Sequence, residues 1–294
     1  MARAYGRSVR SPLPSPPPAV VLSRLVRAAL EEDLARGDLT SDAIFDPDTP
    51  GSARLVAREA LVLAGLPVVR AVFAAVDARV QVEALAAEGD ALGPGDVAAR
   101  LRGPVRSLLH GERVALNFAQ RTSGVASAAR RYVDALPATT PCRIADTRKT
   151  TPLLRALERY AVRCGGAFNH REDLGAAVML KDNHLAAAGG VRAAVERVRA
   201  YAPHTTRIEL EVDTMEQLDE ALEVGVDIVM LDNFDDASTR EAVARVAGRC
   251  LVEASGGITL GRVKTLAKAG VDVISVGAIT HSARAVDLGL DWGS

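Results

Sequence analysis

The sequence predicts an α/β protein in which a small N-terminal α+β domain precedes a closed or nearly closed parallel β/α barrel. After Pro137, about six short apolar runs alternate with helical patterns, which is typical of a parallel sheet built from βα units. So long a succession of such units favours a barrel over a doubly wound sheet. No GxGxxG motif follows any of these runs, which further weakens a dinucleotide-binding fold.

Composition and charge narrow the classes of function. The chain has 294 residues, of which 48% are hydrophobic and 25% charged, so one large or two smaller globular domains are expected. The formal net charge of -1 gives no overall positive field that would attract nucleic acid or an anionic membrane. The three cysteines match no zinc or redox pattern, which indicates buried thiols in a reducing compartment, so we expect a cytoplasmic protein. No apolar run reaches the roughly 18 residues of a membrane span.

The first 18 residues predict a disordered tail. This segment holds three arginines, five prolines and no acidic residue, and the prolines would break the amphipathic helix of a transit peptide. We therefore exclude residues 1–18 from the predicted fold.

The next part of the chain predicts the small α+β domain. Leucines and valine at positions 22, 25, 26 and 30 have helical spacing, and Gly37 closes that helix into a polar loop over 38–45. Strand-like runs at 52–65 and 80–90 flank a helical pattern, and residues 93–103 are typical of a hairpin. A long helix carrying Arg113 begins near Val105. We expect this domain to span residues 19–116, with the C-terminal residues 286–294 packing against it and the barrel occupying residues 117–285.

Residues typical of helix N-termini support the predicted helices of the barrel. Pro152 is expected in the first turn of the helix over 151–166, and Thr214 is expected to cap the next but one, with Gln217 completing a capping box. The predicted strands cover residues 142–147, 176–182, 207–213, 226–233, 250–257 and 271–278.

Every predicted barrel strand ends on polar residues, which is where β/α barrels build their active sites. Strand alternation places Glu209, Glu211 and Asp213 on one face, pointing into the barrel, where a buried carboxylate needs a cation or metal partner. The polar strand ends are Asp146, Arg148 and Lys149; Lys181 and Asp182; Glu211 and Asp213; Asp232 and Asn233; Glu253 and Ser255; and Ser275 and Gly277.

Two further features indicate an anionic ligand. The last two strands end in "ASGGI" and "VGAIT", whose backbone N–H groups are suited to a phosphate, although an ordinary tight turn explains either loop alone. The loop "GGAFNHRED" adds His170 and Arg171 to the cations of the strand ends. The cations Arg148, Lys149, Arg171 and Lys181 are expected to face Glu211 and Asp232. Such a pocket suits a polyanionic substrate, with the acids holding Mg²⁺ or sugar hydroxyls.

The same residues carry a resemblance to a known family. The motifs "DTRKT", "GGAFNHR", "KDNH", "ELEVD", "LDNF", "SGGI" and "VGAITHS", in this order and spacing, resemble quinolinate phosphoribosyltransferase, a glycosyltransferase of NAD biosynthesis. The resemblance runs from about Leu25 to the end and includes "EEDLARGDLTSDAIF" and "GERVALN". It implies an α/β fold with an incomplete, TIM-like β/α barrel beside an N-terminal α+β sandwich domain. It also implies a homodimer, or a larger assembly of dimers, with shared active sites.

The resemblance implies both a reaction and its residues. Phosphoribose would pass from phosphoribosyl pyrophosphate to quinolinate with loss of the 2-carboxylate, and Mg²⁺ but no organic cofactor would be needed. The implied catalytic residues are Lys149, Lys181, Glu211 and Asp232, of which Glu211 and Asp232 would support Mg²⁺ directly or through water and ribose. The implied substrate-binding residues are the partner's Arg113, Thr147, Arg148, His170, Arg171, Ser255, Gly256, Gly257, Gly277 and Ala278.

Three other functions stay open on the sequence alone. A related pyrophosphorylase could use a different acceptor, because the motifs define the phosphoribosyl donor better than the acceptor. A Schiff-base lyase could use Lys181 as nucleophile, although it would not need so many neighbouring cations. RNA binding rests only on the arginines of the tail.

Overall fold

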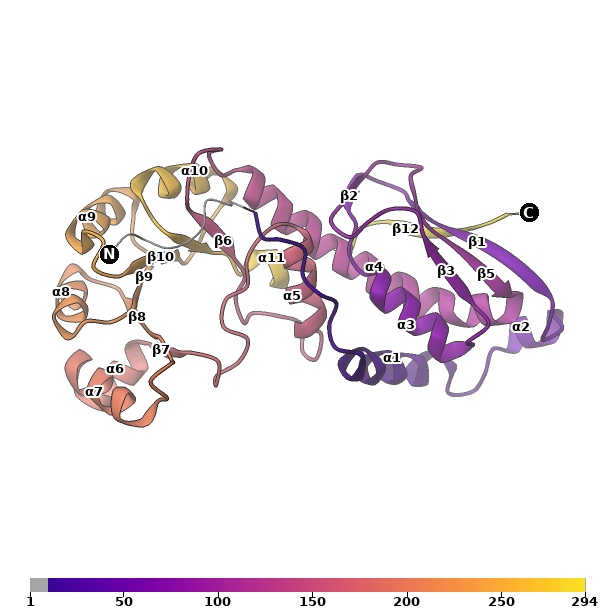
Figure 1. Cartoon of the computed structure of the whole chain (residues 1–294), viewed down its shortest axis with the longest axis horizontal. Coiled ribbons are helices and arrows are strands. Elements are labelled where there is room, and N and C mark those ends of the chain that lie inside the picture. The colour runs from indigo at the N-terminus through magenta and orange to yellow at the C-terminus, as the bar shows by residue number, and fades with distance from the viewer. Residues whose placement is uncertain (1–9, 294) are drawn as a thin grey trace. The chain divides into compact units, whose positions relative to one another are not determined.

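The computed structural model describes residues 10–293, which fall into two compact units that we describe separately (Figure 1). The barrel unit comprises Arg10, residues 131–148 and residues 167–277. The sandwich unit comprises residues 11–130, 149–166 and 278–293.

The barrel unit contains six parallel strands in the order β6-β11-β10-β9-β8-β7. Within the described residues no pairing joins β6 to β7, so the barrel is incomplete, as the sequence motifs imply. The strands are β6 (Arg143–Ala145), β7 (Val178–Leu180), β8 (Ile208–Val212), β9 (Ile228–Asp232), β10 (Leu251–Ser255) and β11 (Val273–Ser275).

Helices follow the strands and pack beside one another in chain order (Figure 1). They are α6 (Asp182–Ala188), α7 (Val191–Tyr201), α8 (Met215–Val224), α9 (Asp236–Val246) and α10 (Leu260–Ala269). The predicted cap of α8 is confirmed, because Thr214 Oγ1 accepts a hydrogen bond from the N–H of Gln217 over 3.3 Å. The side chain of Gln217 returns to the N–H of Asp213 over 2.7 Å, one residue before the position that a regular capping box uses.

The sandwich unit is built on an antiparallel sheet in the order β12-β1-β5-β3. Its strands are β1 (Pro50–Ala57), β3 (Gln81–Ala84), β5 (Val97–Pro104) and β12 (Leu288–Trp292), and β2 (Leu61–Val62) pairs separately with β4 (Ala91–Leu92). Its helices are α1 (Ala19–Leu34), α2 (Leu39–Ile44), α3 (Leu66–Val76), α4 (Val105–Asp134), α5 (Arg155–Cys164) and α11 (Ala278–His281), and α4 continues into the barrel unit.

The sheet and helices of the sandwich unit share one hydrophobic core, in which Leu55, Leu101, Phe73 and Leu108 are at most 2% exposed. Gly111 lies inside α4, where glycine ordinarily weakens a helix. A Cβ at this position would lie 2.6 Å from the ring of Phe73. The glycine therefore allows α3 to pack closely against α4.

Four local predictions differ from the structure. The polar loop after Gly37 contains α2, because Asp38 accepts hydrogen bonds from the N–H groups of Thr40 and Ser41 and caps it. Residues 93–103 form no hairpin, because β4 pairs with β2 while β5 pairs with β1 and β3. Pro152 precedes α5 instead of lying in its first turn, because Leu153 adopts a left-handed φ of 66° that a helix excludes.

The fourth difference concerns the expected tail. Residues 1–9 lie outside the described residues. In the described part, Ser11 is only 9% exposed, and its N–H donates to the carbonyl of Gly166 over 2.8 Å. The segment after Arg10 therefore contacts the fold where disorder was expected.

The two units also divide the chain at points other than those expected. The expected boundary after residue 116 lies inside α4, and residues 149–166 and 278–285, expected in the barrel, group with the sandwich unit. The C-terminal residues form β12, which pairs with β1.

Cys142, Cys164 and Cys250 are buried and form no disulfide within the described part of the chain. Burial raises the pKa of the Cys142 thiol to about 12 and also raises the pKa of Cys164. Neither thiol is therefore suited to nucleophilic chemistry. Among residues 10–293 no helix is both long and apolar enough to cross a membrane.

Candidate active site

The polar residues at the strand ends of the barrel unit occupy neighbouring positions. Asp232, at the end of β9, pairs in register with Ser255, at the end of β10. Lys181 directly follows β7, which pairs with β8, the strand that carries Glu211. The carboxyl edge of the sheet therefore brings these residue types together, as the strand pattern predicts.

Lys181 and Glu211 form an ion pair at this edge, between Nζ and Oε2. The lysine side chain is 43% exposed, whereas that of Glu211 is 14% exposed. Glu211 shares a face of β8 with Glu209, while Leu210 and Val212 are fully buried on the other face, as predicted. A charged lysine that ligands can reach is suited to bind an anion.

The turn after β9 fits closely against the turn after β10. Asn233 has a left-handed φ of 57°, and its Nδ2 donates to Asp232 Oδ2 over 2.8 Å. Gly256 has a φ of 79°, and a Cβ there would lie 2.4 Å from Asn233 Oδ1 and 2.8 Å from Asp232 Oδ1. Only glycine fits this position without displacing the carboxylate of Asp232.

A buried trio lies deeper in the barrel unit. His170 Nε2 is 3.3 Å from Glu209 Oε2 and 3.2 Å from Glu253 Oε1, and both glutamates are 3% exposed. Burial acts to lower the pKa of His170, but hydrogen bonds with Glu209 and Glu253 outweigh it and raise that pKa to about 10. Burial raises the pKa of Glu209, and the charge of Glu253 raises it further. At neutral pH the trio therefore holds one proton more than a neutral imidazole with two ionised carboxylates would hold.

The backbone N–H of Arg171 donates to His170 Nδ1 over 2.7 Å. Nδ1 accepts this bond through its lone pair, so Nε2 carries the ring proton and faces the two glutamates, and the trio as a whole shares the additional proton. The atoms of the trio lie within 4.8 Å of one another, as in a metal site. However, Nε2 cannot ligate a metal while it carries the proton. The trio is thus suited to hold the imidazole in one orientation.

Asp146 fixes the loop that carries His170. It is fully buried, and its carboxylate accepts hydrogen bonds from the N–H of His170 and from Asn169 Nδ2, each over 2.7 Å. Phe168 forms an isolated parallel bridge with Ala145, the last residue of β6, and the ring of Phe168 lies 4.4 Å from the guanidinium of Arg143. Asp146, which the sequence places at a strand end, is therefore a structural anchor.

Two half-buried arginines lie near this loop. Burial lowers the pKa of Arg171, and the positive charge of Arg148 lowers it further. The guanidinium of Arg171 donates to the carbonyl of Ala177 over 3.1 Å. An anion bound near both arginines would relieve their mutual repulsion.

The sandwich unit carries three of the predicted site residues. Lys149 follows Arg148 directly in the chain and is exposed, Ala278 begins α11, and Arg113 is exposed on α4. The sequence motifs did not reveal the link between His170 and its two glutamates. Strand alternation indicates only that Glu209 points inward, and no local pattern connects Glu209 to His170, which lies in a loop 39 positions earlier.

Comparison with known protein families identifies both parts of the chain. Residues 38–123 match the model of the N-terminal domain of quinolinate phosphoribosyl transferase, and residues 125–291 match the model of its C-terminal domain. The two matches together cover most of the chain.

Individual relatives agree with the family models. A probable nicotinate-nucleotide pyrophosphorylase [carboxylating] of Bacillus subtilis is 42% identical over 92% of this chain and 93% of its own length. The human nicotinate-nucleotide pyrophosphorylase [carboxylating] is 41% identical over 93% of this chain and 92% of its own length. The crystal structure of NadC from Streptococcus pyogenes superposes with a TM-score of 0.91 at 42% identity, covering 96% of this chain and all of that one.

Proposed function

Because the chain belongs to the quinolinate phosphoribosyltransferase family, we propose that it transfers phosphoribose from phosphoribosyl pyrophosphate to quinolinate. The reaction releases pyrophosphate and CO₂ and yields nicotinate mononucleotide for NAD biosynthesis. The observation that carries the proposal is the set of charged residues at one edge of the barrel sheet, with the ion pair of Lys181 and Glu211 beside the Asp232 turn.

The cationic residues bind the two carboxylates of quinolinate. Arg148 and Arg171 suit this role because each guanidinium can fork onto a carboxylate, and their mutual repulsion favours an anion. His170, held by its two glutamates, sets one edge of the acceptor site. Lys149 meets a substrate carboxylate or the anions of the donor, and the partner's Arg113 completes the site.

Glu211 and Asp232 bind the ribose hydroxyls of the donor and support Mg²⁺. Carboxylate oxygens are the ligands that Mg²⁺ prefers, and one oxygen of each residue is engaged by Lys181 or Asn233. The donor set therefore fits Mg²⁺, held in part through water and ribose. When bound, the ion would neutralise charge on the pyrophosphate.

The glycine turns hold the 5′-phosphate of the donor. Gly256 and Gly257 both have left-handed φ angles, and Gly256 has no room for a side chain, so backbone N–H groups can approach the phosphate closely. Thr147 contributes a hydrogen bond. The other phosphate-binding residues are Ser255, Gly277 and Ala278.

The chemistry calls for charge stabilisation more than for proton transfer. The pyridine nitrogen already presents its lone pair, so the first step needs no general base. Glu211 and Asp232 stabilise the positive charge that develops on the ribose, and Lys149 and Lys181 stabilise the departing pyrophosphate. The 2-carboxylate leaves afterwards as CO₂, because the positive nitrogen of the pyridinium formed in the first step stabilises the electron pair left on C2, and C2 then takes up a proton from water.

Location and assembly follow from the same proposal. The protein acts in the cytoplasm, as its buried thiols suggest, and it works as a homodimer or a larger assembly of dimers with shared active sites. An exposed Arg113 on α4 supports the sharing, because its side chain is available to a second subunit.

The acceptor separates this function from the nearest alternative. Purified protein is incubated with phosphoribosyl pyrophosphate, Mg²⁺ and either quinolinate or nicotinate, and the formation of nicotinate mononucleotide is followed. We expect kcat/KM for quinolinate to exceed that for nicotinate by at least about 100-fold, because a site built for two carboxylates is left with unpaired charges by one. A preference for nicotinate would refute the proposed acceptor. The Schiff-base alternative is disfavoured because Lys181 is ion-paired, whereas an amine nucleophile must be neutral.

A further inference from the structure

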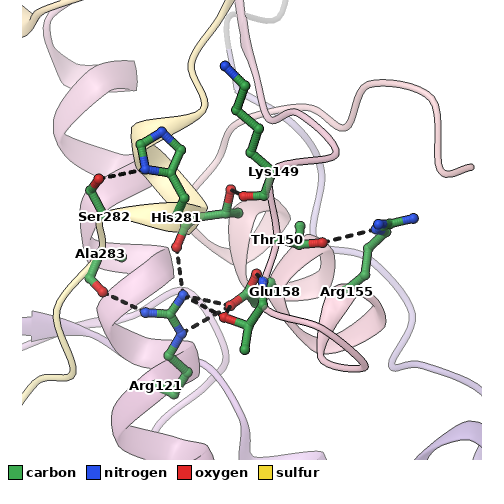
Figure 2. Close-up of polar contacts among 10 residues, drawn as sticks. Arg121, Lys149, Thr150, Arg155, Glu158, His281, Ser282 and Ala283 are labelled. Atoms are coloured by element: carbon green, nitrogen blue, oxygen red, sulfur yellow. Dashed lines mark hydrogen bonds and ion pairs between the residues drawn. The ribbon is translucent and has the colours of Figure 1, made fainter.

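A hydrogen-bonded network in the sandwich unit fixes the backbone at Lys149 (Figure 2). Thr280 Oγ1 donates to the carbonyl of Lys149 over 2.7 Å. Two residues later, the N–H of Thr151 donates to Glu158 Oε2 over 3.0 Å, and its hydroxyl donates to Oε1 over 2.7 Å. The segment 149–151 is therefore held at both ends.

Arg121 is the centre of this network. Its guanidinium binds Glu158 Oε1 through Nε, at 3.0 Å, and Nη2, at 2.6 Å. It also donates to the carbonyls of Thr280 and Ala283, over 2.6 and 2.5 Å. Arg121 thereby links α4 and α5 to the segment around α11. Figure 2 shows its guanidinium directed at Glu158 of α5 and at the carbonyl of Ala283.

The network holds together two segments that carry proposed substrate residues. Lys149 lies in one of them, and Ala278 begins the other. Figure 2 shows the Lys149 side chain extending away from Arg121 and Glu158, so the contact with Thr280 holds the lysine at its backbone.

Two observations argue that this order serves the site. Glu158 is fully buried, and burying an ion pair costs desolvation energy that a hydrophobic pair would avoid. In the same turn, Leu153 is 80% exposed and holds a left-handed φ of 66°, a strained conformation that persists where neighbouring contacts enforce it. An exposed turn kept in a strained conformation is characteristic of a functional segment.

We propose that Arg121, Glu158 and Thr280 are positioning residues that set the place of Lys149 for the phosphoribosyl transfer, an inference that rests on the proposed function. They do not touch substrate. They act by holding the backbone from which the lysine reaches the anions, and a misplaced charge stabilises the transition state poorly.

Thr280→Val tests the proposal with little disturbance, since it keeps the shape of a fully buried side chain and removes its hydrogen bond to Lys149. We expect kcat/KM to fall at least about fivefold, and we expect Thr280→Ser, which keeps the hydroxyl, to recover most of it. Thr239→Val is the matched control, because Thr239 is 1% exposed and its hydroxyl also donates to a backbone carbonyl over 2.7 Å, in α9. The control should lose similar stability but keep kcat/KM within about twofold.

Hydrogen exchange supplies a readout that does not depend on catalysis. The amides of residues 149–151, 153 and 154 should exchange faster in Thr280→Val and in Arg121→Lys than in wild type, and at the wild-type rate in Thr239→Val. Arg121→Met is avoided because it would leave the buried Glu158 without its cation and could prevent folding.

The outcomes are distinct. Wild-type kcat/KM in Thr280→Val, or an equal loss in both valine variants, would overturn the positioning role. Unchanged exchange in residues 149–154 would overturn the anchoring itself. If the wild-type protein made no nicotinate mononucleotide, the proposed function would fail, and the exchange data would still decide whether the network orders this segment.

Discussion

The backbone N–H of Arg171 donates to Nδ1 of His170 over 2.7 Å, which places the ring proton of His170 on Nε2, between two buried glutamates. Adjacent residues of one loop thus have linked roles. Arg171 offers its guanidinium to an anion, and its backbone selects the tautomer of the histidine beside it.

This arrangement predicts how stability changes with pH. Hydrogen bonds with Glu209 and Glu253 raise the pKa of His170 from 6.5 to about 10 against burial. The stabilisation that comes from the proton shared by the trio is therefore complete below about pH 6.5 and is lost as the pH rises through about 10. The difference in free energy of unfolding between wild type and His170→Gln should shrink by about 1 kcal/mol or more over that range. Urea unfolding at several pH values measures it. If the difference in free energy of unfolding between wild type and His170→Gln stayed constant over this pH range, the trio would not hold the additional proton.

Lys181 should contribute to catalysis far more than to stability. Lys181→Ala should lower kcat at least about tenfold, because it removes a charge that stabilises departing pyrophosphate. The melting temperature should change by only about 2 °C, since the ion pair is partly exposed. Lys264→Ala, an exposed position on α10, is the control and should be active. Wild-type turnover in Lys181→Ala would remove this residue from the mechanism.

Gly256 should be irreplaceable for a steric reason. Gly256→Ala should raise the KM for phosphoribosyl pyrophosphate at least about fivefold, because the new Cβ would displace Asn233 and Asp232. Gly248→Ala separates this effect from backbone strain, because Gly248 has a similar φ of 77° with nothing within 4 Å of the added Cβ. Both variants should lose about 1 kcal/mol of stability, but only Gly256→Ala should affect the KM. If Gly256→Ala and Gly248→Ala changed the KM for phosphoribosyl pyrophosphate equally, the clash at Gly256 would have no functional consequence.

Arg113 should act across the subunit interface of the proposed dimer. Arg113→Ala and Lys181→Ala should each be nearly inactive alone. With random subunit exchange, about half of the dimers are mixed and each holds one intact site, so activity should return to about a quarter of wild type. Steady-state assays of the mixture, after exchange is verified by mass spectrometry, measure the recovery. A mixture that stays inactive would exclude shared sites.

The sequence predicts those features whose signals are local. Local patterns predict the βα series, the cap at Thr214 and the inward face of Glu209 and Glu211. The structure confirms all three. The short helix α2 escaped prediction because the side chain of Asp38 stabilises six residues that otherwise look like a polar loop.

Contacts between distant residues could not be predicted in this way. Arg121 and Glu158 are 37 positions apart on two helices, and each is an unremarkable charge on its own helix. The same holds for His170 and its glutamates, which meet only after the strands pair. Tertiary packing brings such pairs together, and the sequence pattern of one segment does not identify the distant residue that it contacts.

The most direct test of the account is a product balance with quinolinate labelled at the 2-carboxylate. Purified protein with phosphoribosyl pyrophosphate and Mg²⁺ should release labelled CO₂, pyrophosphate and nicotinate mononucleotide in equal amounts, and omission of the donor should abolish all three. Labelled CO₂ without nicotinate mononucleotide, or a nucleotide product that keeps the label, would contradict the proposed reaction.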